Sequence, residues 1–111
     1  MSDTVDDTDE LPATASDFAD AYPEVWTQYA DLGKACSEAG PLDGETKRLV
    51  KLALAVGAQS EGAVHSHTRR ALDEGVDPAA LDHVAVLATT TLGFPKAMAA
   101  RSWIRDITES E

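Results

Sequence analysis

The amino-acid sequence predicts an all-α domain of five to six helices around a central antiparallel helix pair, residues 44–57 and 61–74. In residues 44–57, apolar side chains recur at i, i+3, i+4 and i+7, the spacing of one helix face. Further apolar residues cover much of the opposite face, so we expect this helix to be buried on all sides. No stretch shows the alternation of apolar and polar residues that is typical of a β-strand.

Two helical segments are expected before this pair. Ser16 or Asp17 can cap a short first helix, and Pro23 suits the first position of a second helix. The Gly40-Pro41 step ends the second helix. The residues that recur near helical spacing along it are Trp26, Tyr29, Gly33 and Cys36. We expect this stripe to face the interior, with the cysteine as a small buried apolar group.

Capping residues mark the ends of the central helices. Asp43 is expected to cap the first and Ser60 the second, and Gly75 is placed for a left-handed turn at the end of the second. The stripe along the second helix consists of Val64, His67 and Ala71. His67 is therefore expected to point where the apolar groups point.

Two more helices follow the central pair. Asp77 is expected to cap the first of them, with Pro78 at its first position. Its apolar stripe consists of Leu81, Val84, Ala88 and Leu92. A break at Gly93-Phe94-Pro95 then precedes a final helix from Pro95 to about Thr108, whose expected inward residues are Ala97, Ala100, Ile104 and Ile107.

The charge of the chain excludes some partners. The 111 residues include 20 acidic and 9 basic side chains, for a net charge of −11. Such a chain repels nucleic acid and anionic membranes, so we expect neither as a partner. The excess of acidic residues fits a halophilic source, and it is also compatible with an ordinary acidic cytosolic protein.

The ends and the cysteine content indicate a cytoplasmic protein. The first ten residues carry five acidic groups and no basic one, the reverse of a signal peptide, and no apolar run approaches the ~20 residues that span a bilayer. Residues 1–12 are expected to be a disordered acidic tail ahead of one helical domain, residues 13–111. A single cysteine excludes an internal disulfide and a cysteine-based metal site.

The segment LDGETKRLVKLALAVGAQSEGAVHSHTRRAL, which begins at Leu42, resembles the carboxymuconolactone decarboxylase family, which includes the alkylhydroperoxidase D-like proteins. The resemblance covers roughly residues 23–107 and implies a homo-trimer or homo-hexamer without a cofactor. In redox members, a Glu precedes a Cys-x-x-Cys-x-x-x-His run by about twelve residues. On this chain the Glu falls on Arg48, the cysteines on Ser60 and Ala63, and the histidine on His67.

The resemblance and the residue types give two candidate catalytic residues, His67 and Ser60. An imidazole suits proton transfer near neutral pH, although a lone histidine on an apolar stripe is also typical of a core group bonded to a backbone carbonyl. Ser60 can be a nucleophile or simply a helix cap. The two lie seven residues apart, about 10 Å along a helix, which exceeds hydrogen-bond reach.

Three arginines are candidate substrate-binding residues: Arg69, Arg70 and Arg48. The adjacent pair can bind a substrate carboxylate. It can equally pair with nearby acidic residues, namely Glu61, Asp73 or Glu74. We expect no metal site, since two positions along a helix separate His65 from His67 by about 200°.

Three functions are compatible with these residues. The first is a non-redox enzyme that acts on a small carboxylated lactone or related acid by His67 acid–base chemistry. The second is a non-catalytic, oligomeric small-molecule binder of the same fold. The third is an alkylhydroperoxidase-like antioxidant, which Ser60, Ala63 and Arg48 argue against, because a peroxidase of this kind needs a thiolate and a resolving thiol.

The charge yields a testable prediction about assembly. Bringing together subunits of charge −11 costs repulsion, which falls as the Debye length shrinks from about 10 Å at 0.1 M to about 3 Å at 1 M salt. Light scattering after size exclusion should show a homo-oligomer that is more complete in 2 M than in 0.1 M KCl, with a higher melting temperature. An 11.8 kDa monomer in both salts would contradict the assembly.

Overall fold

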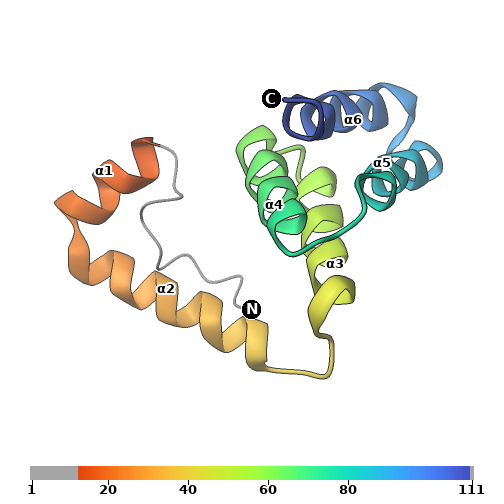
Figure 1. The fold of residues 1–111 in the computed structure, drawn as a ribbon. Coiled ribbons are helices and arrows are strands. Elements are labelled where there is room, and N and C mark those ends of the chain that lie inside the picture. Colours follow the sequence, from red (N-terminus) through yellow and green to blue (C-terminus); the bar gives the residue numbers. More distant parts are fainter. Residues whose placement is uncertain (1–12, 111) are drawn as a thin grey trace. The chain divides into compact units, whose positions relative to one another are not determined.

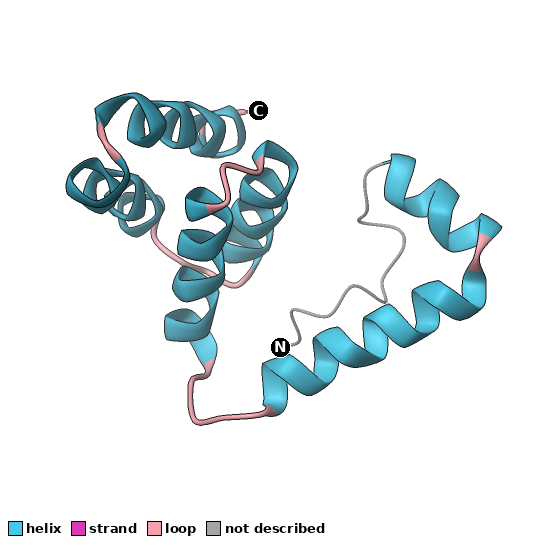
Figure 2. Ribbon diagram, turned by 180° about the vertical axis from the view of Figure 1, so that it is seen from behind, coloured by secondary structure: helices cyan, strands magenta, loops and turns pink. Residues whose placement is uncertain are grey.

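The computed structural model describes residues 13–110, which form helices joined by short loops and contain no strand (Figures 1 and 2). The six helices are α1 (Ala13–Ala21), α2 (Pro23–Glu38), α3 (Gly44–Gly57), α4 (Glu61–Asp73), α5 (Pro78–Leu92) and α6 (Phe94–Thr108). The predicted all-α class is confirmed. The predicted tail, residues 1–12, lies outside the described residues.

The chain divides into two compact units, Met1–Pro41 and Leu42–Glu111. In the first unit, Pro23 occupies the first turn of α2, as predicted. The Phe18 ring of α1 lies 5.3 Å from that of Tyr22 and 6.5 Å from that of Trp26, measured between ring centroids. Aromatic contacts therefore connect the two helices of this unit.

The prediction that Cys36 is buried is wrong. Its side chain is exposed, and so is that of Tyr29. The more buried positions of α2 are Trp26, Ala30, Gly33 and Ser37. Trp26 and Gly33 belong to both the predicted stripe and the observed face, whereas Tyr29 and Cys36 each lie one position, or about 100°, away from that face.

The second unit is a four-helix arrangement in which α3 packs against α4 and α5, and α6 packs against the same two helices. Small side chains fill much of its interior, so the helices can approach closely. The buried core residues are Leu52, Ala55, Val56, Val64, Ala71, Val76, Leu81, Ala85, Ala88, Ala97, Ala100 and Ile104. The predicted inward residues of α6 are confirmed at Ala97, Ala100 and Ile104, and Ile107 is half-buried.

Local capping explains where these helices begin and end. The Ser60 side chain accepts a hydrogen bond from the Ala63 amide at 3.3 Å, and Asp77 accepts one from the Ala79 amide at 2.9 Å. Gly75 has a φ of 85°, as a left-handed turn requires. Asp43 occupies the cap position of α3, but its side chain makes no capping hydrogen bond, which corrects the prediction. Its neighbour Gly44 has a φ of 54°, so the first turn departs from regular helical geometry.

The loop between α3 and α4 is fixed by a side chain. Gln59 adopts a φ of 53°, in the left-handed region that favours glycine. Its side-chain nitrogen Nε2 donates to the Val56 carbonyl at 3.0 Å and to the Lys96 carbonyl of α6 at 3.3 Å. These bonds offset the strained backbone and attach the loop to α6.

The prediction that α3 is buried on all sides is wrong within one chain. Leu52 and Val56 are buried, but Leu54 is 64% exposed and Val50 is 40% exposed. On α5, Val86 and Leu87 are exposed as well. The second unit thus keeps an apolar surface that its own helices leave uncovered.

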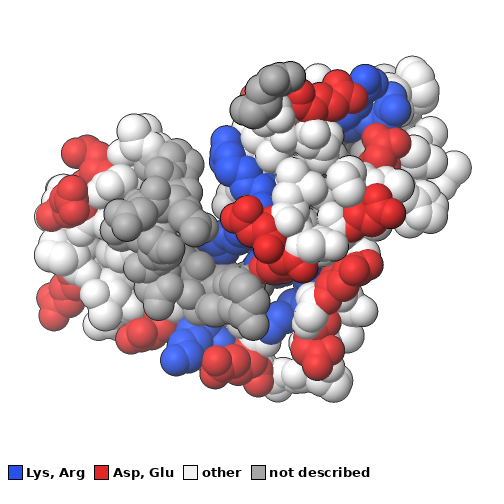
Figure 3. Space-filling view, viewed as in Figure 1, with Lys and Arg blue, Asp and Glu red and all other residues white. Residues whose placement is uncertain are grey.

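No helix in the described part of the chain is both long enough and apolar enough to cross a membrane. Acidic side chains are spread over the described surface in Figure 3, as expected from 20 acidic against 9 basic residues in the whole sequence.

Thr68 on α4 yields a testable prediction about stability. Its side chain is fully buried, and its hydroxyl has no hydrogen-bond partner within residues 13–110. Replacing it by valine removes an unsatisfied polar group at almost constant shape, so Thr68→Val should raise the free energy of unfolding by about 1–2 kcal/mol. Urea titration measures this change.

The exposed Thr90 of α5 provides the matched control. Thr90→Val should change the stability by less than about 0.5 kcal/mol. A clear loss of stability in Thr68→Val would mean that the hydroxyl is bonded in the folded protein.

Candidate functional site

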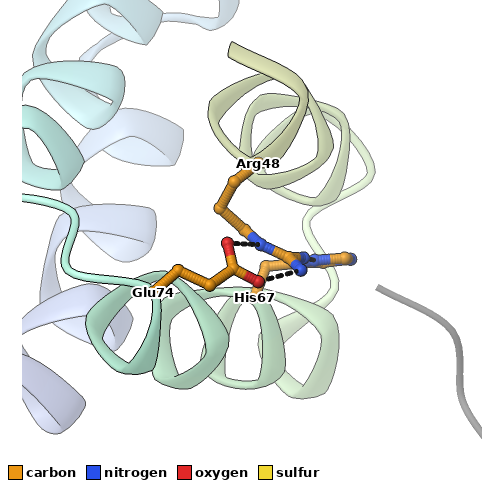
Figure 4. A network of polar contacts seen from close by, with 3 residues as sticks. All are labelled: Arg48, His67 and Glu74. Carbon is orange, nitrogen blue, oxygen red and sulfur yellow. Dashed lines mark hydrogen bonds and ion pairs between the residues drawn. The ribbon is translucent and has the colours of Figure 1, made fainter. Parts of the chain in front are cut away.

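A polar network of Arg48, His67 and Glu74 joins α3 to α4 (Figure 4). Arg48 Nε lies 3.1 Å from Glu74 Oε1 and Arg48 Nη2 lies 2.8 Å from Glu74 Oε2, a two-pronged contact. The remaining terminal nitrogen, Nη1, lies 2.7 Å from His67 Nδ1. One guanidinium therefore binds a carboxylate and an imidazole at the same time.

Helix geometry explains why these three residues meet. Arg48 lies four residues before Leu52, on the buried side of α3, and only 2% of it is exposed. His67 and Glu74 are two helical turns apart on one side of α4, facing α3. Glu74 is also the C-cap of α4, where the helix dipole disfavours a negative charge, so the Arg48 cation stabilises it there.

The Arg48 contact defines the protonation pattern of the imidazole. A guanidinium carries only hydrogen-bond donors, so His67 Nδ1 must be the acceptor in this contact. An imidazole whose Nδ1 accepts is neutral and carries its proton on Nε2. While this contact holds, neither ring nitrogen can act as a base, because Nδ1 accepts from Arg48 and Nε2 carries the proton.

His67 lies at the edge of the core rather than within it, which corrects its predicted place on the apolar stripe. The buried residues of α4 are Val64, Thr68 and Ala71, and His67 is half-buried beside them. The hydroxyl-bearing Thr68 takes the core position that the apolar pattern assigned to the histidine. The edge position is what allows Arg48 to reach the ring.

The structure separates Ser60 from His67. Ser60 is the N-cap of α4, and its hydroxyl oxygen is bonded to the Ala63 amide. Since α4 is continuous from Glu61 to Asp73, the two candidate catalytic residues lie about 10 Å apart along its axis. Ser60 is a helix cap in this structure.

The three candidate substrate-binding arginines occupy different environments. Arg48 is buried, and each of its three guanidinium nitrogens makes a contact within the network. Arg69 is exposed and lies about 200° around α4 from His67. Arg70 is half-buried and lies three residues from His67, on the same side of the helix. Of the adjacent pair, Arg70 is the one that shares a face with the imidazole.

Glu74 is the site residue whose role the sequence did not reveal. From the sequence, Glu74 is a candidate partner for Arg69 or Arg70. In the structure, both of its carboxylate oxygens instead contact Arg48, 26 residues away. The available signal was a charged residue on an apolar stripe. Arg48 precedes Leu52 by one turn, and a buried cation requires an acidic partner.

A second feature of this unit is an apolar groove between α3 and α5, with a volume of 470 Å³. His83 is its one ionisable lining residue, and no acidic side chain lines it. The other lining residues are Leu49, Val50, Ala53, Val56, Gly57, Ala80, Val84, Leu87, Ala88, Thr91 and Leu92. His67 is not among them, so the groove and the polar network are separate features.

Comparison with known proteins identifies the type of chain. A model described as the carboxymuconolactone decarboxylase family matches residues 21–106. A Haemophilus influenzae protein described as uncharacterized is 30% identical over 71 residues, which cover 64% of this chain and 63% of that protein. The chain therefore spans less than two thirds of the length of that relative. No solved structure matches.

The network yields a prediction about stability. Glu74→Gln removes the negative charge that balances Arg48 while keeping the side-chain shape. Because Arg48 is 2% and Glu74 only 17% exposed, the loss should be about 2–3 kcal/mol, near the lower end for buried ion pairs. Urea or thermal unfolding measures it.

The Arg101–Asp82 pair is the control. Its N–O distance of 2.7 Å is as short, but each side chain is 37% exposed. Asp82→Asn should cost at most about 1 kcal/mol. An equal loss of unfolding free energy in the two variants would show that the buried pair Arg48–Glu74 stabilises the fold no more than an exposed pair does.

Proposed function

Since the chain belongs to the carboxymuconolactone decarboxylase family, we propose that it is a non-redox enzyme that acts on a small carboxylated lactone or related acid. The observation that carries this proposal is the 2.7 Å contact between Arg48 Nη1 and His67 Nδ1. It presents a fixed, neutral N–H donor at the edge of the helical core. A donor of this kind stabilises negative charge that develops on a substrate oxygen.

Loss of CO2 from such a substrate needs this stabilisation. When the bond between the ring carbon and the carboxylate breaks, CO2 leaves and the electron pair stays on the ring. Conjugation places the charge on the lactone carbonyl oxygen as an enolate. His67 Nε2–H donates a hydrogen bond to that oxygen, and a proton from solvent then adds to carbon. His67 supplies electrophilic stabilisation in this step, in place of the base role that the sequence suggested.

Arg70 is the arginine best placed to hold the substrate carboxylate. It shares the His67 side of α4, and a guanidinium binds a carboxylate through two parallel hydrogen bonds. Arg48 is a positioning residue, because it acts on the substrate only through His67. Arg69 is directed to another side of the helix.

The residues at the motif cysteine positions support a non-redox reaction. Ser60 and Ala63 occupy the places of the two motif cysteines, and neither a hydroxyl nor a methyl group forms a disulfide. Cys36 is the single cysteine of the chain and has no resolving partner within it. Arg48 occupies the place of the carboxylate that precedes the motif.

We also propose that a second copy of this chain covers the apolar surface of α3 and α5. Two copies of charge −11 repel each other over most of their surfaces. The 470 Å³ groove lacks acidic lining residues, so it is a place where two copies can meet without opposing carboxylates. The exposed Leu87, which lines the groove, and the exposed Leu54 of α3 would be removed from water.

A pair of substitutions tests the role of His67. In His67→Asn, the amide oxygen can still accept from Arg48 while the donor at the Nε2 position is lost. Release of CO2 from carboxymuconolactone and related acids should fall about 10²–10³-fold in kcat, with little change in KM and in melting temperature. His67→Gln places an amide N–H near the Nε2 position and should recover part of the rate.

The control is Cys36→Ser, which should release CO2 at the normal rate. No peroxide should be consumed by either protein in the presence of a dithiol. Thermal stabilisation by these lactones without any CO2 release would identify a non-catalytic binder. Peroxide turnover that Cys36→Ser abolishes would overturn the non-redox assignment.

A further inference from the structure

We propose that Glu61, His65 and Asp106 form a binding site for a divalent transition-metal cation such as Zn²⁺. His65 Nε2 lies 3.0 Å from Asp106 Oδ2 and 4.0 Å from Glu61 Oε2. One ligand atom from each residue lies within 4.8 Å of the other two. Three groups of metal-ligand chemistry thus converge on one small region.

Two packed helices hold these groups in place. Glu61 and His65 are one turn apart on α4, so their side chains share a face. Asp106 comes from α6, which packs directly against α4. A cation bound here would connect the first turn of α4 to the last turns of α6.

The distances fit coordination after small side-chain rotations. A tetrahedral ion at about 2.0–2.2 Å from each ligand separates neighbouring ligand atoms by about 3.3–3.6 Å. The observed separations of 3.0 and 4.0 Å lie on either side of this range. The His65 side chain is 20% exposed, while Glu61 and Asp106 are 58% and 51% exposed. The imidazole is therefore the more fixed ligand, and the two carboxylates have room to adjust.

The ligand set indicates which cations fit. One imidazole with two carboxylates suits Zn²⁺, Co²⁺ or Mn²⁺, whereas Mg²⁺ and Ca²⁺ prefer oxygen ligands alone. Two carboxylates balance the charge of a divalent ion. Three protein ligands leave at least one position for water or an anionic ligand.

The nearby basic groups are largely engaged elsewhere. Arg105 Nε donates to Glu109 Oε2 at 2.8 Å. Arg101 donates to Asp82 at 2.7 Å. Arg69 follows His65 by one turn on α4, but it is exposed and long enough to keep its charge in water.

No sequence pattern indicates this site, and the proposal departs from the expectation that the chain has no metal site. Asp106 lies 41 residues from His65, and only the packing of α4 against α6 brings them together. The site is also distinct from the network of Arg48, because His65 and His67 point about 200° apart around α4.

Metal titration of the full chain tests the proposal. After EDTA treatment and dialysis, Zn²⁺ should bind with one ion per chain and raise the melting temperature by several degrees, and EDTA should reverse the shift. Co²⁺ should give visible absorption bands typical of direct coordination by nitrogen and oxygen. His65→Ala and Asp106→Asn should each weaken Zn²⁺ binding at least tenfold.

His83→Ala is the matched control, since His83 is exposed and lies on α5, outside the cluster. It should bind Zn²⁺ like the unmodified protein. Unchanged affinity in His65→Ala, or a Co²⁺ spectrum identical to that of the hydrated ion, would overturn the proposal. Equal stabilisation by Mg²⁺ would also overturn it, because it would show diffuse attraction to an acidic surface.

Discussion

The buried guanidinium of Arg48 is the constraint on which the second unit depends. An arginine that is 2% exposed has lost nearly all its contact with water, so the protein must supply what water would have given it. Glu74 supplies the opposite charge and His67 supplies a lone pair. The register of α3 against α4 is thereby specified, because a shift of either helix would leave a charge unpaired in the interior.

The rest of the unit surrounds this contact with small side chains. Alanines contribute much of the core, which allows close helix packing but provides little apolar area per residue. The remaining apolar surface of α3 and α5 stays outside. A small domain built in this way has a modest hydrophobic contribution, so its directional contacts carry a larger share of the specificity.

Sequence reasoning succeeded where structure is determined locally and failed where it depends on tertiary packing. The caps at Ser60 and Asp77 and the turn at Gly75 were predicted because the chemistry of each lies within a few residues. The prediction that Cys36 is buried was wrong, because adjacent residues of a helix point about 100° apart and Cys36 lies one position from the buried face.

The candidate site was predicted in part for the same reason. His67 and Arg48 could be singled out as residues, but their contact spans 19 positions and the Glu74 partner lies 26 positions from Arg48. No local pattern encodes which helix faces which. The sequence makes Arg48 a candidate substrate-binding residue, whereas in the structure its Nη1 contacts the imidazole of His67.

The pairing of Arg48 with Glu74 also limits the mutational routes open to this chain. Glutamate at position 48 would put two carboxylates face to face where one cation now lies between an acid and an imidazole. Arg48 and Glu74 would have to change together, since either single change leaves a buried charge without its partner. We therefore expect substitutions at positions 48 and 74 to be strongly epistatic.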